Sequence, residues 1–391
     1  MIRSRYLRVR RTKACALLFD DYEQLTIYTL KLVPLDLAIM YLRGISTATP
    51  AKRYTKAECL DAFQRSAWFA RLSVRAHLIA STVLQRDNGI EARHLAIDTL
   101  DDVFTIDPET LARRFLDHAP ALASAAAERA LSASGTSPED IDAIVVSTCT
   151  GYLCPGLSGY VVERLGLRSN VRAFDLVGQG CAAALPNLQL GRALLAAREC
   201  DRVLSVCVEI SSAAMYLDDD PGVLISACLF GDGAGAAVLS RDPGDEGRSI
   251  AWVDSESVID VTKRTSLMFE QREGMLRNIL TREVPSLAAE RADQLLGTVL
   301  GRAGLQTTDI ATWIFHAGGR DVLHALEARI GVERHCFRYS AAMLREYGNL
   351  SSAFVYFVLE AALADGAPDG WWWLSSFGAG FSAHGALLEV R

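Results

Sequence analysis

An internal repeat constrains the fold of this chain more than any other feature. The stretch "GTSPEDIDAIVVSTCTG" begins at Gly135, and "GLQTTDIATWIFHAGG" begins 169 residues later at Gly304. Each has a glycine after a helical stretch, a short polar turn, an Asp-Ile pair and an apolar segment typical of a buried strand. The chain is therefore predicted to contain a duplicated α/β unit.

The repeat continues beyond these strands. "GQGCAAALPNLQL" corresponds to "EYGNLSSAFVYFVLEAAL", which places Cys181 and Asn349 at matched helix starts. "LFGDGAGAAVLS" and "SSFGAGFSAHGALLEV" then pair as Gly-rich turns between apolar strands. Two copies packed about a pseudo-twofold axis would bring such matched helix starts and strand ends together, so we expect the chemistry to lie there.

Cys181 stands at a helix start that the surrounding residues predict. Phe174 to Val177 resemble the end of a buried strand, Gly178 and Gly180 permit a tight turn, and the alanines after Cys181 favour a helix. Unpaired N–H groups and the helix dipole favour an anion at that point, so this thiol is expected to ionise more readily than a free one. The alternative is a small cysteine buried in the core.

His316 and Asn349 are the other candidates for the site. His316 ends the strand-like "TWIFH" at the position that Ser147 holds in the first copy. A lone histidine after an apolar strand is often structural, and an asparagine at a helix start is often an N-cap. Their matched positions favour a Cys/His/Asn site, for which a cysteine hydrolase is one interpretation, although the duplication does not favour papain-like folds.

Composition narrows the function classes. The chain has 391 residues, half of them apolar, and its net charge of −7 argues against nucleic-acid binding. Nine cysteines without a CxxC pair predict reduced thiols in the cytoplasm and no metal site. The basic "MIRSRYLRVRRTK" and the short apolar "ACALLF" are neither a signal peptide nor a membrane span. We expect residues 1–39 to be a loosely ordered extension, with a first strand and turn from Met40.

Five motifs carry a family resemblance over Met40 to Arg391: "GQGC", "LFGDGAGA", "FHAGG", "YGNLSS" and "FGAGFSAHGALL". In this order and approximate spacing, the chain resembles the type III polyketide synthases of the chalcone synthase and bacterial alkylresorcinol or alkylpyrone synthase group. The resemblance implies an α/β thiolase-like fold with duplicated, layered α-β-α-β-α architecture. It also implies halves at 40–250 and 251–391, a homodimer, and acyl-CoA and malonyl-CoA as substrates without a cofactor.

The resemblance assigns a role to each candidate. Cys181 would carry the acyl chain, His316 and Asn349 would drive decarboxylation of malonyl-CoA, and Phe230 matches the family's gatekeeping phenylalanine. Uncharged donors suit this step because they stabilise an enolate that a carboxylate would repel. The implied reaction loads an acyl starter, expected to be fatty, extends it iteratively and closes an alkylresorcinol or alkylpyrone ring.

Further residues follow from the same motifs. Matching the family pattern predicts a pocket lined by small residues together with the gatekeeper: Phe230, Cys149, Ser211, Ala214, Ser226 and Ser351. Small side chains around a pocket leave room for longer acyl chains. The alternative is that these residues are small because they pack closely in the core. The Gly-rich loop with Phe377, Gly378 and Gly380 is expected to hold an oxyanion, and Arg86, Arg93 and Arg320 are candidates for binding CoA.

Two other function classes stay open. A β-ketoacyl-ACP synthase III would share the fold and the three catalytic residues, but its pattern has an asparagine where this chain has Gly319. A non-catalytic binding protein on a thiolase fold would be expected to have lost one of the three residues. The starter, the number of extensions and the mode of cyclisation depend on the shape of the cavity.

Overall fold

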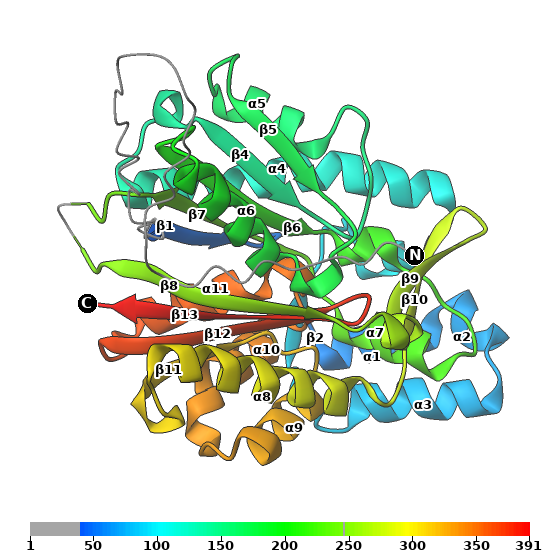
Figure 1. Ribbon diagram of the computed structural model, residues 1–391. Coiled ribbons are helices and arrows are strands. Elements are labelled where there is room, and N and C mark those ends of the chain that lie inside the picture. The colour runs from blue at the N-terminus through cyan, green and yellow to red at the C-terminus, as the bar shows by residue number, and fades with distance from the viewer. Residues whose placement is uncertain (1–39, 245–246) are drawn as a thin grey trace, which may run out of the picture. The chain divides into compact units, whose positions relative to one another are not determined.

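The structure is a computed structural model that describes residues 40–244 and 247–391, and its central element is one mixed sheet (Figure 1). The extension expected over residues 1–39 lies outside this described part. The strands of the sheet are β1 (Met40–Ala48), β4 (Ala143–Ser147), β5 (Arg172–Leu176), β6 (Arg202–Glu209), β7 (Gly233–Ser240), β8 (Ile250–Ile259), β11 (Ile310–Phe315), β12 (Gly370–Gly378) and β13 (Ser382–Val390). Their order is β11-β12-β13-β8-β1-β7-β6-β4-β5.

Apart from the edge strand β5, which has no counterpart among the described strands, this order is palindromic about the junction of β8 and β1. From the centre outward, the first half has the order β1, β7, β6 and β4, and the second half has the order β8, β13, β12 and β11. In each half the first two neighbouring pairs are antiparallel and the third pair is parallel. β4 and β11 are the two strands that the sequence repeat matched. The duplicated α/β architecture is therefore confirmed, while the boundary between the halves at residues 250 and 251 stays a prediction.

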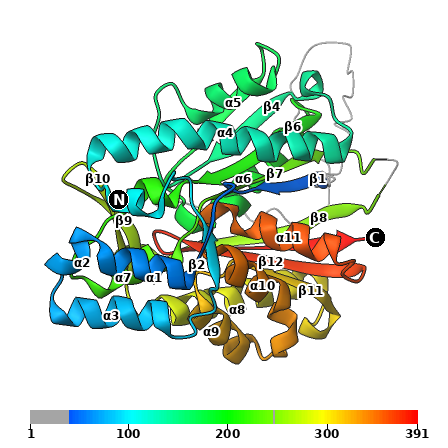
Figure 2. The same cartoon turned by 180° about the vertical axis from the view of Figure 1, so that it is seen from behind.

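Helices lie on both sides of each half of the sheet (Figures 1 and 2). α6 (Ala184–Ala196) and α11 (Phe354–Ala364) lie in the middle, and each contacts strands of both halves. α4 (Pro108–Ser134) covers the outer face of the first half, and α8 (Val284–Ala303) covers that of the second. Both outer helices end at a glycine with positive φ, Gly135 and Gly304, as expected for a left-handed C-cap. The result is the layered α-β-α-β-α arrangement.

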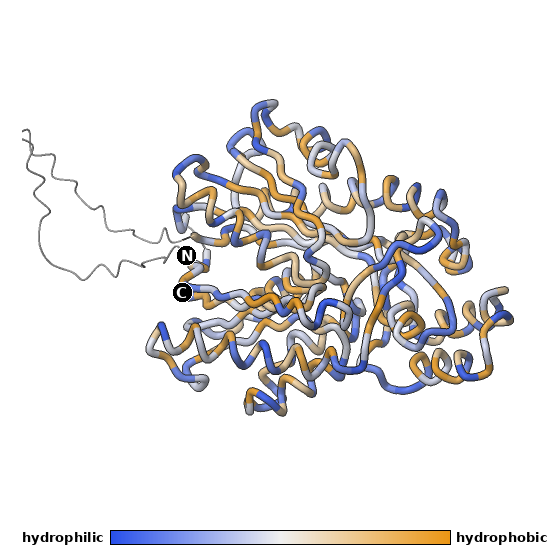
Figure 3. Tube along the Cα trace, turned by 45° about the vertical axis from the view of Figure 1, so that its right-hand side comes forward, coloured by the Kyte–Doolittle hydropathy of each residue, from blue (hydrophilic) through white to orange (hydrophobic). Residues whose placement is uncertain are grey.

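Apart from short 3₁₀ turns, seven further α-helices and two two-stranded ribbons complete the regular structure of the described residues. They are α1 (Lys56–Arg65), α2 (Ala67–Arg71), α3 (Val74–Gln85), α5 (Leu157–Leu165), α7 (Pro221–Leu229), α9 (Arg320–Ile330), α10 (Arg338–Tyr347), and the two-stranded ribbons β2 (Arg53–Thr55) with β3 (Ala92–His94) and β9 (Leu267–Arg272) with β10 (Met275–Leu280). Apolar residues concentrate on the sheet strands and central helices, and hydrophilic ones on the outer turns (Figure 3). Among the helices described, none is long and apolar enough to cross a bilayer.

A buried polar network holds the two central helices to the sheet. The Asn187 side chain of α6 is fully buried and donates to the carbonyls of Val145 at 3.0 Å and Val206 at 3.1 Å. Its oxygen accepts from the Ser205 hydroxyl at 2.6 Å, and that hydroxyl lies 2.7 Å from the Tyr356 hydroxyl of α11. Because buried polar groups are costly when unpaired, this network fixes how α6 and α11 sit on the sheet.

We expect Asn187→Ala to lower the free energy of unfolding by about 3 kcal/mol, because it leaves several buried groups without partners. Chemical denaturation followed by tryptophan fluorescence measures this loss. Gln189→Ala is the matched control, since this amide lies on the same helix but bonds to Ser257 near the surface. An Asn187 variant as stable as the Gln189 variant would show that the network is not needed.

Candidate active site

Cys181 lies in a tight turn between β5 and α6. Gly178 and Gly180 have φ of +84° and +57°, where a side chain would be strained, and Gly180–Ala182 form a short 3₁₀ turn. α6 begins at Ala184, so Pro186 falls in its first turn, where proline is tolerated. The predicted strand, glycine turn and helix are confirmed, and a 3₁₀ turn lies between the glycine turn and the helix. The expectation that the strand is buried is wrong, because β5 is the edge strand of the sheet and is largely exposed.

His316 and Asn349 project toward a common space. A Cβ built at Gly318 would lie 3.9 Å from His316 Nε2 and 4.0 Å from Asn349 Nδ2. Asn349 Nδ2 donates to the Gly318 carbonyl at 3.2 Å, and Asn349 Oδ1 accepts from the Ser351 amide at 2.8 Å. Cys181, His316 and Asn349 all line one pocket of about 850 Å³, here called the outer pocket. The structure thus brings the three predicted residues together.

Burial keeps both ionisable groups of this trio neutral. Burial raises the pKa of the Cys181 thiol to about 12, and a hydrogen bond from Ser351 Oγ at 3.3 Å opposes the shift only partly. Burial also lowers the pKa of His316 to about 3. The expectation that the helix start makes this thiol more acidic is therefore wrong for the unliganded site, because loss of solvation outweighs the dipole. A neutral imidazole can still accept the thiol proton when the site is occupied.

A buried carboxylate behind Cys181 was missed from the sequence. Glu209 at the end of β6 accepts hydrogen bonds from the Cys149 amide at 3.0 Å and the Thr150 hydroxyl at 2.8 Å. Ser351 Oγ lies 3.3 Å from Glu209 Oε1 and 3.3 Å from Cys181 Sγ, so it connects carboxylate and thiol. Burial raises the pKa of Glu209. An acidic residue at the end of the apolar run "VLSVCVE" is the signal that could have identified it.

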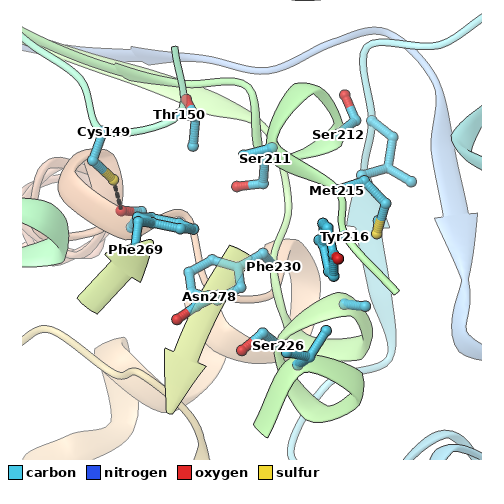
Figure 4. Close-up of a pocket in the computed structure, with 15 residues that line it drawn as sticks. Cys149, Thr150, Ser211, Ser212, Met215, Tyr216, Ser226, Phe230, Phe269 and Asn278 are labelled. Atoms are coloured by element: carbon cyan, nitrogen blue, oxygen red, sulfur yellow. Dashed lines mark hydrogen bonds between the residues drawn. The ribbon is translucent and has the colours of Figure 1, made fainter. Parts of the chain in front are cut away.

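All six predicted pocket residues line a second cavity, here called the inner pocket (Figure 4). These residues are Cys149, Ser211, Ala214, Ser226, Phe230 and Ser351. The volume of the inner pocket is only about 30 Å³, because Tyr216, Phe230 and Phe269 fill much of the space between the small side chains. Phe230 lines both pockets and so lies between them. Small residues in the sequence therefore do not make a large cavity here.

The outer pocket opens between α3, α7 and α8. Its apolar walls include Leu78 and Val83 of α3 and Ile225 of α7. Arg86 and Arg320 line it as predicted, together with Arg282, which the sequence did not single out. Phe377 of the Gly-rich loop also lines it, and a Cβ at Gly378 would lie 2.6 Å from the Ala182 amide nitrogen, so the loop packs on the Cys181 turn.

Two predicted residues need correction. Arg93 is buried, and its guanidinium donates to the carbonyls of Ala227 at 2.7 Å and Phe230 at 3.1 Å. It stabilises the end of α7 and does not line the outer pocket. The Gly380 amide donates to the Leu267 carbonyl at 3.3 Å, so this N–H is already used and is not a free oxyanion donor.

Comparison with known families identifies a match over nearly all of the described chain. Residues 48–259 match the family described as FAE1/Type III polyketide synthase-like protein. Residues 260–389 match the C-terminal domain of chalcone and stilbene synthases. Together the two matches cover both copies of the repeat.

Individual relatives are distant but cover most of the chain. Proteins named 3,5-dihydroxyphenylacetyl-CoA synthase from Streptomyces toyocaensis and Amycolatopsis balhimycina are 27% and 28% identical, each over 88% of this chain and over 89% and 92% of their own length. The crystal structure of 1,3,6,8-tetrahydroxynaphthalene synthase from Streptomyces coelicolor A3(2) is 25% identical, with a TM-score of 0.81 over 90% of this chain and 99% of that one. The crystal structure of PKS-I from the brown alga Ectocarpus siliculosus is also 25% identical. Its TM-score is 0.81, over 90% of this chain and 98% of that one.

The neutral site predicts how the reactivity of Cys181 depends on pH. Because burial raises the pKa of the Cys181 thiol to about 12 with His316 present, the rate of alkylation by iodoacetamide in the wild type should rise with pH up to pH 10 without a plateau. His316→Gln removes the group that accepts the thiol proton as the sulfur reacts, so its alkylation should be slower at every pH. Labelling of the Cys181 peptide, measured by mass spectrometry, gives both profiles. Identical profiles in the two proteins would contradict a role for His316 as proton acceptor.

Proposed function

The chain belongs to the type III polyketide synthase family, acyltransferases that condense malonyl-CoA iteratively, and from this premise we propose that Cys181, His316 and Asn349 carry the reaction. The observation that supports this most is that the three side chains, which come from both halves of the duplicated fold, line one pocket. Its volume of about 850 Å³ is that of an ordinary ligand pocket.

Loading is the first step of the proposed mechanism. The Cys181 thiol gives its proton to the neutral His316 imidazole, and the sulfur attacks the thioester carbonyl of the starter acyl-CoA. CoA leaves as a thiolate that takes the proton from the imidazolium, which leaves the acyl group as a thioester on Cys181. We propose the Cys181 backbone N–H as one donor to the oxyanion that forms during this exchange.

Extension uses the space that His316 Nε2 and Asn349 Nδ2 share. Both groups donate hydrogen bonds to the thioester oxygen of malonyl-CoA, so the negative charge that develops when CO₂ leaves is stabilised on that oxygen. The enolate carbon attacks the acyl group on Cys181, and the Cys181 thiolate leaves. The longer chain, now on CoA, returns to Cys181 for the next round.

The basic rim supports binding of the CoA part of the substrates. Arg86 and Arg282 are exposed, and both line the outer pocket with Arg320. Nη1 of Arg320 lies 3.7 Å from Asp87 Oδ2, which leaves Arg86 and Arg282 better available for phosphate. We propose that the pantetheine arm runs along the apolar wall of α3 to Cys181.

The inner pocket supports a short starter in preference to a fatty one. Its volume of about 30 Å³ leaves no room for a long hydrocarbon chain, whereas ligand pockets usually measure about 300–1,000 Å³. The names of the relatives, 3,5-dihydroxyphenylacetyl-CoA synthase and 1,3,6,8-tetrahydroxynaphthalene synthase, refer to hydroxylated aromatic products. We therefore propose a short acyl-CoA starter and a hydroxylated aromatic product for this chain.

A fatty acyl starter with an alkylresorcinol or alkylpyrone product is the second candidate. It is favoured by the apolar wall of the outer pocket, where Leu78, Ile225 and Leu280 would contact a hydrocarbon chain. The expected homodimer and the cytoplasmic location stay predictions. For the homodimer, the edge strand β5 and the exposed Val177 after it offer a surface to a second copy.

Cys181→Ala should abolish both acyl labelling of the protein and release of polyketide, because no other cysteine of residues 40–244 and 247–391 lines the outer pocket. The assay incubates the protein with acyl-CoA and radiolabelled malonyl-CoA, and the labelled peptide is identified by mass spectrometry. Cys154→Ala is the control, since this thiol is exposed and lies outside both pockets. Labelling that persists in the Cys181 variant would refute the mechanism.

Competition between starters separates the two candidate functions. Acetyl-CoA, malonyl-CoA, hexanoyl-CoA and palmitoyl-CoA are offered together. We expect more product that starts from acetyl-CoA or malonyl-CoA than product that starts from palmitoyl-CoA. Liquid chromatography with mass spectrometry gives the product ratio. Preferential use of palmitoyl-CoA would favour the alkylresorcinol or alkylpyrone alternative and place the hydrocarbon chain in the outer pocket.

A further inference from the structure

Two main-chain hydrogen bonds hold Asn349 across the junction between the two copies of the repeat. Its amide donates to the Leu229 carbonyl at 2.9 Å, and its carbonyl accepts from the Gly231 amide at 3.0 Å. They form a short parallel bridge between Phe230 of the first copy and Asn349 of the second. How the Asn349 side chain lies relative to Cys181 therefore depends on this bridge.

A buried cation contacts both sides of the Phe230–Asn349 bridge. The Arg93 guanidinium donates to the carbonyls of Ala227 and Phe230, at the end of α7. On the other side, a Cβ built at Gly348 would lie 3.1 Å from Arg93 Cγ. The stem of this arginine therefore packs on the backbone directly before Asn349, while its charged end binds the backbone around Phe230.

The short strand β3, which carries Arg93, is tied to both copies as well. The His94 carbonyl accepts from the Asp232 amide of the first copy at 2.8 Å. The Glu91 amide donates to the Arg345 carbonyl of the second copy at 2.7 Å. Arg93 lies between these two contacts, so its own backbone is fixed relative to both copies.

The charge of Arg93 suits this place. The last carbonyls of a helix have no partner within it, and the helix dipole makes this end negative. Arg93, of which only 7% is exposed, supplies a cation and two hydrogen bonds at the end of α7. Because unpaired buried carbonyls are costly, loss of the guanidinium would favour a shift of the end of α7 and of the bridge attached to it.

We propose that Arg93 is a positioning residue that holds the Phe230–Asn349 bridge and so aims the Asn349 amide at malonyl-CoA. This inference rests on the proposed function, in which that amide stabilises the enolate formed when CO₂ leaves. A donor stabilises a developing oxyanion only when it is already in hydrogen-bonding position. Loading of Cys181 by an acyl-CoA does not use the Asn349 amide, so it does not depend on the bridge in this way.

Arg93→Met tests this role, because methionine keeps most of the stem without the guanidinium. We expect decarboxylation of malonyl-CoA to fall roughly tenfold, since a misplaced donor loses part of its effect, while loading of Cys181 by acetyl-CoA stays within about threefold of the wild type. Release of labelled CO₂ measures decarboxylation, and mass spectrometry of the Cys181 peptide measures loading. A general loss of structure would lower both rates alike.

Combination with Asn349→Ala shows whether Arg93 acts through that amide. In a protein that already lacks the amide, Arg93→Met should slow decarboxylation no further. Arg93→Lys keeps the charge but not the fork of donors, so its decarboxylation should be only about threefold slower than that of the wild type. If Arg93→Met does not fold, the same comparison with and without Asn349→Ala is made with Arg93→Lys.

Arg114→Met is the matched control. Arg114 is 8% exposed, and its guanidinium also donates to two carbonyls, but these belong to Asp102 and Ser212. Its loss should lower the melting temperature and leave the ratio of decarboxylation to loading unchanged. A folded Arg93 variant with the wild-type ratio, or one whose effect adds to that of Asn349→Ala, would overturn the proposal. If Asn349→Ala itself leaves decarboxylation unchanged, the proposed function fails instead.

Discussion

The active site depends on a contact between two turns that leaves no room for side chains. A Cβ at Gly378 would lie 2.5 Å from the Gln179 carbonyl oxygen and 2.6 Å from the Ala182 amide nitrogen, so only glycine lets β12 reach the Cys181 turn. The Ser376 hydroxyl adds a hydrogen bond to the Ala182 carbonyl at 3.0 Å. One residue earlier on the same strand, the Ser375 carbonyl accepts from the His316 amide at 2.8 Å. Nucleophile and histidine are thus fixed through one strand.

The features that the sequence predicted are local or repeated. The match between Gly135 and Gly304 predicted the duplication, because two copies of one supersecondary unit pack in equivalent ways, and the palindromic sheet follows from it. The turn around Cys181 was predictable because Gly178 and Gly180 need positive φ angles. Matched positions in the two copies also explain why His316 and Asn349 were found without a structure.

The errors and omissions depend on tertiary structure. Sequence predicted an acidic Cys181 from its helix start, but the pKa is raised because distant segments bury the sulfur. Arg93 was assigned to CoA, although the end of α7 provides the carbonyls that bind it. The volume of the inner pocket also depends on tertiary structure, because bulky side chains such as Phe269 occupy the space beside the small residues. Glu209 was missed because its importance comes from the distant segments that bind it behind Cys181, which the run "VLSVCVE" alone does not show.

The palindromic sheet has a consequence for how a nascent chain reaches this fold. The halves join through two residue pairs, Met40 with Trp252 and Tyr41 with Ala251, on the first strand. β1 must therefore wait for β7, almost 200 residues later, before its own half can close. α6 keeps one apolar face uncovered until the second half emerges from the ribosome. The strands β7 and β13 pair with their neighbours in the same way, so once β13 has been synthesised the duplication opens a route to strand exchange between the halves.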